Sequence, residues 1–385
     1  MIIAAFWLLA ALLFALATRV GSRLGIISIV SQLLVATLAL PLLMALWVEP
    51  TWHLSGAQLV APAWLKNLYS LAFALVLGHI LSDVIDLRLD RQSLKTALPS
   101  FCLPFAVGLA CAVWLLPGET WLGSLAIGLV FAITAIPVLY LYLTHIGYPE
   151  AAIRRLVQTA ILIDLTCWSL FGLAQGSLNL VSLLVPLLGA GVPLLLYASR
   201  VRQPWVFSTF FFVLLVAAEH YRLNALIYGV GYLLCMAALK VPFIAPINPQ
   251  LMKALQTLIA VPLILTYGVV QIDVHSAASS LNGVQIAALL LLPIASKLLG
   301  NWLGLSWLSP ALTPRNRWRE SLLLNIRGLS EIVFLNLLLQ QQLISPAVYF
   351  VLMLMGLIAT LLPALAGLQR LPIAPPDARS TCVKP

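Results

Sequence analysis

Charged residues are scarce in this chain. Only 9% of its 385 residues are Asp, Glu, Lys or Arg, whereas 62% are hydrophobic and the mean hydropathy is +1.05. A soluble globular domain carries about 25% charged residues, so the composition excludes that class. Apolar runs recur along nearly the whole chain, and many reach the roughly 20 residues that a bilayer crossing needs. We therefore predict an all-α polytopic membrane protein.

Patterns typical of enzymes and metal sites are also missing. The five cysteines include no CxxC pair, and the five histidines are scattered along the chain. We find no nucleophile paired with a base and no phosphate-binding glycine loop in a suitable context. The sequence therefore predicts a protein that is not an enzyme and uses no cofactor. The net charge of +9 fits topology and anionic membrane lipids, and it requires no nucleic acid.

The apolar runs and the breaks between them predict thirteen membrane spans. They are expected at 2–18, 25–48, 68–85, 96–116, 122–144, 156–174, 178–198, 204–219, 223–239, 251–271, 281–303, 318–340 and 346–368.

The basic residues support this count. Of the 21 Lys and Arg residues, all but Lys66, Arg222, Lys297 and Arg327 lie in or beside the odd-numbered connections or the C-terminal tail. A wrong number of spans would destroy this alternation. By the positive-inside rule the N-terminus is outside and the C-terminus is cytoplasmic, in a bacterial inner membrane.

Four ionisable residues fall inside predicted spans: Asp164, Lys297, Arg327 and Glu331. A charge at the bilayer centre costs about 3 kcal/mol, so such residues are functional candidates by default. Structural interpretations stay open beside this one. Asp164 and Lys297 can form a buried ion pair that joins two helices, and Arg327 and Glu331 are four residues apart and can neutralise each other. Asp83 and Asp86 fit the solvated end of a helix.

Two of the predicted spans carry helix-breaking residues near their middles. One is "FAITAIPVLYLYL", with Thr134 and Pro137, and the other is "LLNIRGLSEIVFLN", with Asn325 and Gly328. Proline removes a backbone donor, and glycine permits torsions outside the helical region. Broken helices in corresponding positions of two halves indicate a transporter binding site. We expect acidic side chains near the positive helix ends at the breaks and basic side chains near the negative ends.

These segments resemble a known family. "AITAIPVLYLYL" followed by "IDLTCW" is similar to the Thr-Ala-x-Pro-Val-Leu break and the later Asp-Asp-Val-Thr-Ala-Trp of the monovalent cation:proton antiporter-2 family, in the sodium/hydrogen exchanger superfamily. "LNIRGLSEIVFLN" resembles its Asn-x-Arg-Gly-Leu-Thr-Glu-Leu-Ile-Val-Leu-Asn segment, and "SKLLGNWLG" its lysine helix. The matches follow the family order and cover most of the chain.

The resemblance implies roles for several residues. The ion- and proton-binding aspartate falls on Asp164, Thr134 contributes to the same site, and the membrane lysine falls on Lys297. The first aspartate of the family pair falls on Ile163, which is a departure that removes one coordinating oxygen. Family branches with Asn or Gln there are associated with electroneutral exchange or potassium efflux. Whether exchange here is electroneutral depends on whether Lys297 keeps its proton.

The resemblance also implies an architecture and a partner. We expect inverted repeats with two discontinuous crossing helices, alternating access, and a homodimer formed through the scaffold. The expected divisions are a transporter domain over 1–372, with a core at 96–198 and 281–368 and a scaffold at 1–90 and 204–271, and a short cytoplasmic tail at 373–385.

The predicted function is exchange of a monovalent cation, Na⁺ or K⁺, for H⁺. One buried carboxylate, Asp164, would bind either a proton or a cation, and competition between them produces exchange. Two alternatives stay open. The chain could carry another solute on the same fold, since fold does not fix substrate, or it could be a membrane sensor or interaction protein that transports nothing.

Overall fold

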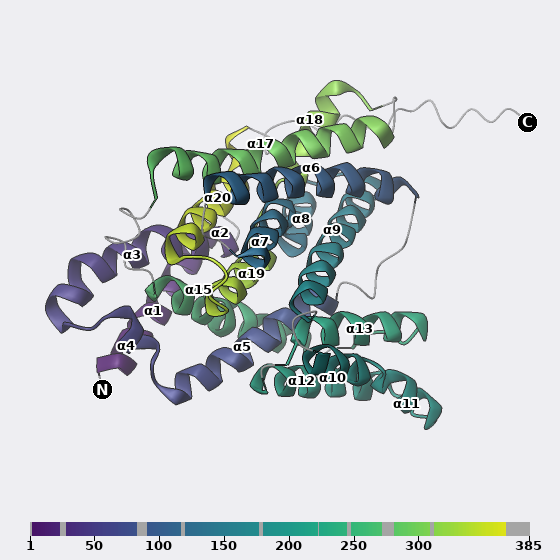
Figure 1. Cartoon of the computed structure of the whole chain (residues 1–385), viewed down its shortest axis with the longest axis horizontal. Coiled ribbons are helices and arrows are strands. Elements are labelled where there is room, and N and C mark those ends of the chain that lie inside the picture. Colours follow the sequence, from purple (N-terminus) through teal and green to yellow (C-terminus); the bar gives the residue numbers. More distant parts are fainter. Residues whose placement is uncertain are drawn as a thin grey trace, which may run out of the picture.

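A computed structural model describes residues 2–23, 28–82, 91–116, 120–176, 180–221, 223–244, 248–271, 281–308 and 312–366. Every regular element in these ranges is a helix (Figure 1). The expected tail at 373–385 lies outside the described residues, as do Asp83 and Asp86. The all-α prediction is thus confirmed for the described part of the chain.

The first half of the chain begins with one continuous helix, followed by a second helix that is interrupted by wider, π-helical turns. The elements are α1 (Ile2–Arg23), α2 (Ser28–Leu34), η1 (Val35–Ala39), α3 (Leu40–Leu43), η2 (Met44–Trp52), α4 (Gly56–Val60), α5 (Ala63–Ser82), α6 (Arg91–Leu115), α7 (Trp121–Ala132), α8 (Ile136–His145) and α9 (Glu150–Gly176). The helix α1 runs five residues past the predicted end, which puts Arg19 and Arg23 on its last turns instead of in a loop.

The second half repeats this mixture of long and interrupted helices. Its elements are α10 (Leu180–Ala190), α11 (Val192–Ala198), α12 (Pro204–His220), α13 (Ala225–Ala238), α14 (Pro249–Leu255), η4 (Gln256–Ala260), α15 (Val261–Val270), α17 (Gly283–Leu308), α18 (Pro314–Leu324), α19 (Leu329–Gln340) and α20 (Pro346–Leu365).

Local sequence explains where several of these helices start. The Thr120 side chain accepts a hydrogen bond from Gly123 N at 3.0 Å at the start of α7. Thr313 and Ser345 cap α18 and α20 in the same way, each followed by a proline in the first turn. A hydroxyl cap satisfies one of the four free N–H groups at a helix start, and proline lacks an N–H that would need a partner there.

Seven helical stretches in the described residues are long and apolar enough to cross a membrane, or up to eight if the bent pair α18 and α19 is one span. Shorter apolar helices occupy Trp121–Ala132, Leu184–Ala198, Pro204–His220 and Ala225–Ala238. Each of the thirteen predicted ranges contains helix. The number of complete crossings therefore stays a prediction, whereas a multi-pass helical protein is confirmed.

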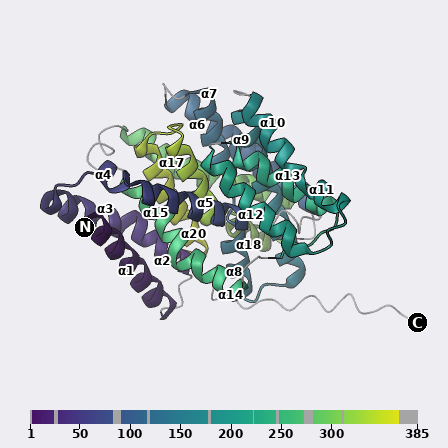
Figure 2. The ribbon, with the colours of Figure 1, turned by 90° about the horizontal axis from the view of Figure 1, so that it is seen from below.

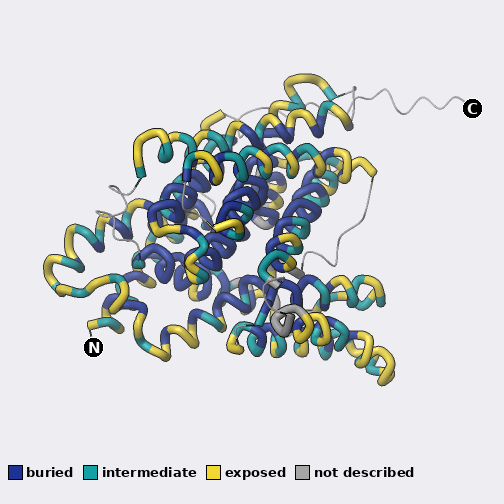
Figure 3. Tube along the Cα trace, in the orientation of Figure 1, coloured by how far each residue is buried: buried dark blue, intermediate teal, exposed yellow. Residues whose placement is uncertain are grey.

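The middle of the molecule is formed by α7, α8, α9 and α19 (Figure 1). The helices α6 and α17 pack side by side along one edge, and α5, α12 and α13 lie along the opposite edge (Figures 1 and 2). Ten of the twelve residues of α19 are buried, so this helix contacts protein on all sides. Figure 3 shows the same contrast between the dark blue central helices and the partly exposed outer ones.

Two glycines let α17 approach α6 closely. A Cβ atom on Gly304 would lie 2.6 Å from the carbonyl oxygen of Thr96, and one on Gly300 would lie 2.7 Å from that of Pro99. Small residues four apart allow this kind of close helix contact in membranes. The close packing brings Lys297, one turn before Gly300, to the middle of the bundle, where its side chain is fully buried.

Candidate functional site

The first helix break separates α7 from α8 at residues 133–135, where the backbone is extended. Thr134 and Pro137 were both expected in the middle of this predicted span, and the break lies there. Pro137 is the second residue of α8, where its missing N–H costs nothing. The break therefore comes before the proline, and Thr134 is its central residue.

The second break covers residues 325–328, between α18 and α19, whose axes differ by 42°. Gly328 has φ 165°, which is extended backbone that any residue adopts, so torsional freedom is not what glycine supplies here. A Cβ atom at this position would lie 2.7 Å from Cγ2 of Val138 on α8. Glycine is therefore needed because α8 lies so close to the second break.

The two breaks contact each other directly. The N–H of Ala135 in the first break donates a hydrogen bond to the carbonyl of Ile326 in the second, at 3.2 Å. Together they bring two helix C-termini and two helix N-termini into one buried region. Such ends carry about half a unit of charge each, negative at the C-terminus and positive at the N-terminus.

Both buried cations meet the negative end of α7. Lys297 Nζ donates to the carbonyl of Ala132 and, at 3.4 Å, to that of Ser100. Arg327 donates to the carbonyl of Val130 and, at 2.7 Å, to that of Phe131. These contacts supply partners for the last carbonyls of α7, which a helix leaves unsatisfied. The sequence predicts basic side chains at such an end, and the structure has two there.

The acidic side chains lie at the positive ends. Asp164 projects from the unbroken helix α9, is 3% exposed, and accepts a hydrogen bond from Thr134 N at 3.0 Å. Glu331 lies in the first turn of α19 and forms a buried ion pair with Arg327, 3.0 Å between Nη1 and Oε1. The predicted pairing of Arg327 with Glu331 is confirmed, although Arg327 itself lies in the break and not on a helix.

Several buried polar atoms around the breaks have no hydrogen-bond partner in the described part of the chain. They are the hydroxyl of Thr134, both side-chain polar atoms of Asn325 and the hydroxyl of Ser330. Buried polar groups in native proteins are nearly always satisfied by protein, water or an ion. The oxygens among these groups suit a hard monovalent cation or the water around it.

The structure thus gathers the predicted residues in one region. Lys297 reaches it from α17, Asp164 reaches it from α9, and all the others lie on or beside the two breaks: Thr134, Pro137, Asn325, Arg327, Gly328 and Glu331. The departure at Ile163 is buried beside Asp164, with 1% of its surface exposed. The ion- and proton-binding roles of these residues stay predictions.

Sequence reasoning missed a second polar cluster. Arg155 on α9 binds both carboxylate oxygens of Glu320 on α18, at 2.7 and 2.6 Å, and the Tyr148 hydroxyl donates to the same carboxylate at 3.4 Å. This cluster fixes the helix that carries Asp164 to the first half of the second broken helix. The partners are 165 residues apart in sequence, so no local signal marks the contact. Thr360 was also missed; its hydroxyl donates to the Arg327 carbonyl at 2.6 Å.

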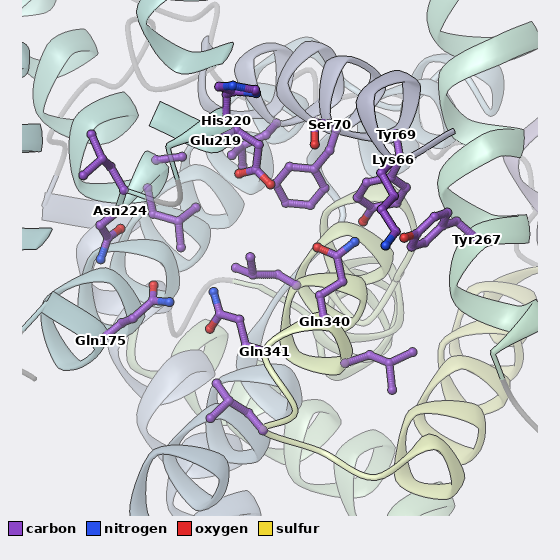
Figure 4. A pocket seen from close by; sticks show the side chains of 18 of the residues that line it. Lys66, Tyr69, Ser70, Gln175, Glu219, His220, Asn224, Tyr267, Gln340 and Gln341 are labelled. Carbon is purple, nitrogen blue, oxygen red and sulfur yellow. The ribbon is translucent and has the colours of Figure 1, made fainter. Parts of the chain in front are cut away.

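A cavity of about 930 Å³ lies at the C-terminal ends of α9 and α19 (Figure 4). Its lining includes residues in or beside the second, fourth, sixth, eighth, tenth and twelfth predicted connections, represented by Lys66, Leu122, Gln175, His220, Gln271 and Gln341. Described residues at the edges of these six predicted connections therefore lie around one cavity.

Comparison with known proteins gives one clear result. No protein-family model matches the chain, and no curated protein does. Among solved structures, the chain is similar to the sodium proton antiporter MjNhaP1 from Methanocaldococcus jannaschii, with a TM-score of 0.60 over 96% of this chain and 98% of that one. The identity is 15%, so the likeness shows a shared fold. An all-helical fold shared with a known antiporter, as the motifs imply, is thus confirmed, and the inverted repeats and crossing helices stay predictions.

Proposed function

We propose that this protein exchanges a monovalent cation, Na⁺ or K⁺, for H⁺ across a membrane, with Asp164 as the shared site. The observation that carries the proposal is the position of the Asp164 carboxylate. It is buried on an unbroken helix and bonded to the amide of Thr134, at the point where two helix breaks meet. One solved structure of similar fold is that of a sodium proton antiporter, which is a transporter and not an enzyme.

Exchange follows from competition for one carboxylate. A proton and a cation both neutralise Asp164, and each excludes the other, so the site alternates between two loaded forms. A neutral loaded site also lowers the cost of moving through the membrane interior, because an unpaired buried charge is expensive there. No further coupling device is needed for one-for-one exchange.

The oxygen shell for the cation would come from the breaks. The Thr134 hydroxyl and the Asn325 side-chain oxygen are buried and lack hydrogen-bond partners in the described residues. The interrupted backbone at 133–135 and 325–328 places carbonyl groups outside the helical pattern, and those of Ile326 and Arg327 already accept hydrogen bonds from protein. Irregular backbone at membrane depth is tolerated where it lines such a site. Lys297, Arg327 and Glu331 act as supporting charges that hold the breaks in place.

Alternating access would come from movement of a core, 96–198 and 281–368, against a scaffold, 1–90 and 204–271. The cavity supports this division, because α9 and α19 line it from the core and α5, α12 and α15 from the scaffold. We further propose thirteen crossings, two of them by discontinuous crossing helices, within a transporter domain over 1–372. The scaffold would form a homodimer in a bacterial inner membrane, with the N-terminus outside and the C-terminus cytoplasmic.

The test is cation-induced pH change in proteoliposomes with Na⁺, K⁺ and Li⁺, for the wild type and Asp164→Asn. The variant keeps the shape of the side chain and removes the charge. We expect a signal for at least one cation in the wild type and none in the variant.

Glu150→Gln is the matched control, since Glu150 is an exposed acid on the same helix, paired only at the surface with Arg154. It is expected to keep full activity. A folded, inserted wild type that responds to none of the cations would contradict the proposed function. A persistent signal in Asp164→Asn would place the shared site elsewhere.

A further inference from the structure

The cavity at the end of α9 and α19 is lined with side-chain amides. Gln175, Gln340 and Gln341 point into it from α9 and from the end of α19 (Figure 4). None of these three makes a side-chain hydrogen bond within the part of the chain that the structure describes. By contrast, Asn224 is occupied in capping α13, and its Nδ2 donates to the Gly172 carbonyl at 2.8 Å. The three glutamines are therefore available to a solute.

The charges in the lining are few and opposite. Glu219, at the end of α12, is the one carboxylate among the described lining residues, and Lys66, near the start of α5, is the one lysine (Figure 4). Both belong to the scaffold side, and the amides belong to the core side. Among the described lining residues, which also include His220, these two carry opposite full charges, so their effects on the potential in the cavity oppose each other.

This cavity is separate from the site at Asp164. Gln175 lies eleven residues after Asp164 on the same helix, which corresponds to about 16 Å along the axis. The residues between the two places include the buried aromatic side chains of Trp168 and Phe171, which pack against Phe334. A cation in the cavity would therefore be bound before it reaches Asp164.

We propose that this cavity is a transit site for a partly hydrated monovalent cation, in which Glu219 supplies the attracting charge and the glutamine amides supply neutral oxygens. The proposal rests on the proposed function and adds a second cation site to it. Amide oxygens are hard ligands without net charge, so they replace part of the water shell without holding the ion tightly. A site on a transport path must bind weakly enough to release.

Lys66 limits the strength of the site. With Glu219 alone, a cavity between apolar helices would concentrate cations strongly, since low-dielectric walls focus the field of a charge. The lysine offsets that field, so the wild-type cavity attracts cations without trapping them. Neutralising Glu219 and neutralising Lys66 should therefore have opposite effects on cation binding in the cavity.

The experiment measures initial transport rates against cation concentration for Glu219→Gln and Lys66→Gln. Membrane vesicles of both orientations are used, so that the cation is supplied either from the face that the cavity opens on or from the opposite face. Glu219→Gln should raise the apparent KM for the cation about threefold on the cavity side, and Lys66→Gln should lower it by a similar factor. Vmax should stay within about twofold in both, because Asp164 is untouched.

Three controls separate attraction from structure. Glu219→Asp keeps the charge and should restore the wild-type KM. Glu49→Gln removes an acid from the same predicted face but outside the cavity, and it should leave KM unchanged. Ionic strength should weaken both effects, because at about 0.1 M salt charges are screened beyond about 10 Å. Equal KM values for all variants, shifts in the same direction, or shifts independent of the side of supply would overturn the proposal.

A failure of the proposed function can be distinguished from a failure of the transit site. If the folded wild type transports no cation, the cavity can still be tested by binding alone, in the Asp164→Asn protein. NaCl should then raise the melting temperature more than choline chloride does, and adding Glu219→Gln should reduce that difference. Equal melting temperatures in the two salts would contradict the transit site as well.

Discussion

At both helix breaks, buried charged side chains compensate the partial charges of the helix ends, but these side chains come from different parts of the chain. The first break, at 133–135, contains only neutral residues, and its charges come from other elements: Lys297 from α17 and Asp164 from α9. The second break carries its own arginine, Arg327, and its acid, Glu331, follows in the next turn. The charges at the first break therefore come from other helices, and those at the second come from the break itself and the helix that follows it.

The hydrogen-bond partners of the two acids differ as well. Glu331 is fixed by a buried ion pair with a guanidinium, and breaking such a pair leaves an uncompensated charge. The Asp164 carboxylate accepts a hydrogen bond from the backbone N–H of Thr134, which carries no net charge. The buried ion pair therefore gives Glu331 a structural role, whereas the exchange at Asp164 stays a proposal.

The largest effect on the free energy of unfolding is expected at Arg327. Arg327→Gln removes the partner of Glu331 and two donors to the end of α7, so it should lower the free energy of unfolding by about 3–5 kcal/mol. Denaturant or thermal unfolding in detergent measures the loss.

Arg154→Gln provides the matched control for that experiment. Arg154 pairs with Glu150 at the surface, where both side chains are at least 75% exposed, and such pairs contribute about 0–1 kcal/mol. Similar losses in the two variants would mean that the second break does not depend on its own charge pair.

A smaller effect is expected where the second break touches α8. Gly328→Ala places a methyl group 2.7 Å from Val138 Cγ2, and overpacking of this kind costs about 1–3 kcal/mol. Val138→Ala removes that contact atom, so the double variant should be more stable than the two single losses predict.

Gly283→Ala is the control for this cycle, because a Cβ atom there meets nothing within 4 Å. It should be neutral in the same unfolding assay. Strict additivity in the Gly328 and Val138 pair would show that close approach does not explain the glycine.

The smallest effect on stability is expected at the first break. Thr134→Val removes a buried hydroxyl that has no hydrogen-bond partner in the described residues, so the free energy of unfolding should change by less than about 0.5 kcal/mol. The apparent KM for the cation should nevertheless rise, because one ligand oxygen is lost. Thr134→Ser keeps the oxygen and should behave as wild type. A large loss of stability in Thr134→Val with unchanged KM would make this residue structural.

Much of the site was visible in the sequence, since a charge within an apolar run stands out. Asp164, Lys297, Arg327 and Glu331 were all recognised in this way, and each lies at the breaks. The exact residues of the first break were not predicted, because Pro137 is compatible with the start of α8 as well as with a kink. Chain pattern alone does not distinguish these two uses of proline.

Contacts between distant segments could not be predicted. The donation from Arg327 to Phe131 joins residues 196 apart, and it depends on how α7 and the second break pack. The role of Gly328 is likewise a matter of distance to α8, not of its own torsion. The cavity also has no local signature, because residues far apart in the sequence supply its walls.

The central claim is that a proton and a cation compete for Asp164, and the pH dependence of transport kinetics tests it most directly. Initial rates against cation concentration would be measured at a series of pH values in wild-type proteoliposomes. Competition predicts that the apparent KM rises about tenfold for each pH unit on the acidic side while Vmax stays constant, because protons occupy the same group. A constant KM with a falling Vmax would contradict the account, since it would place the proton and the cation on different groups.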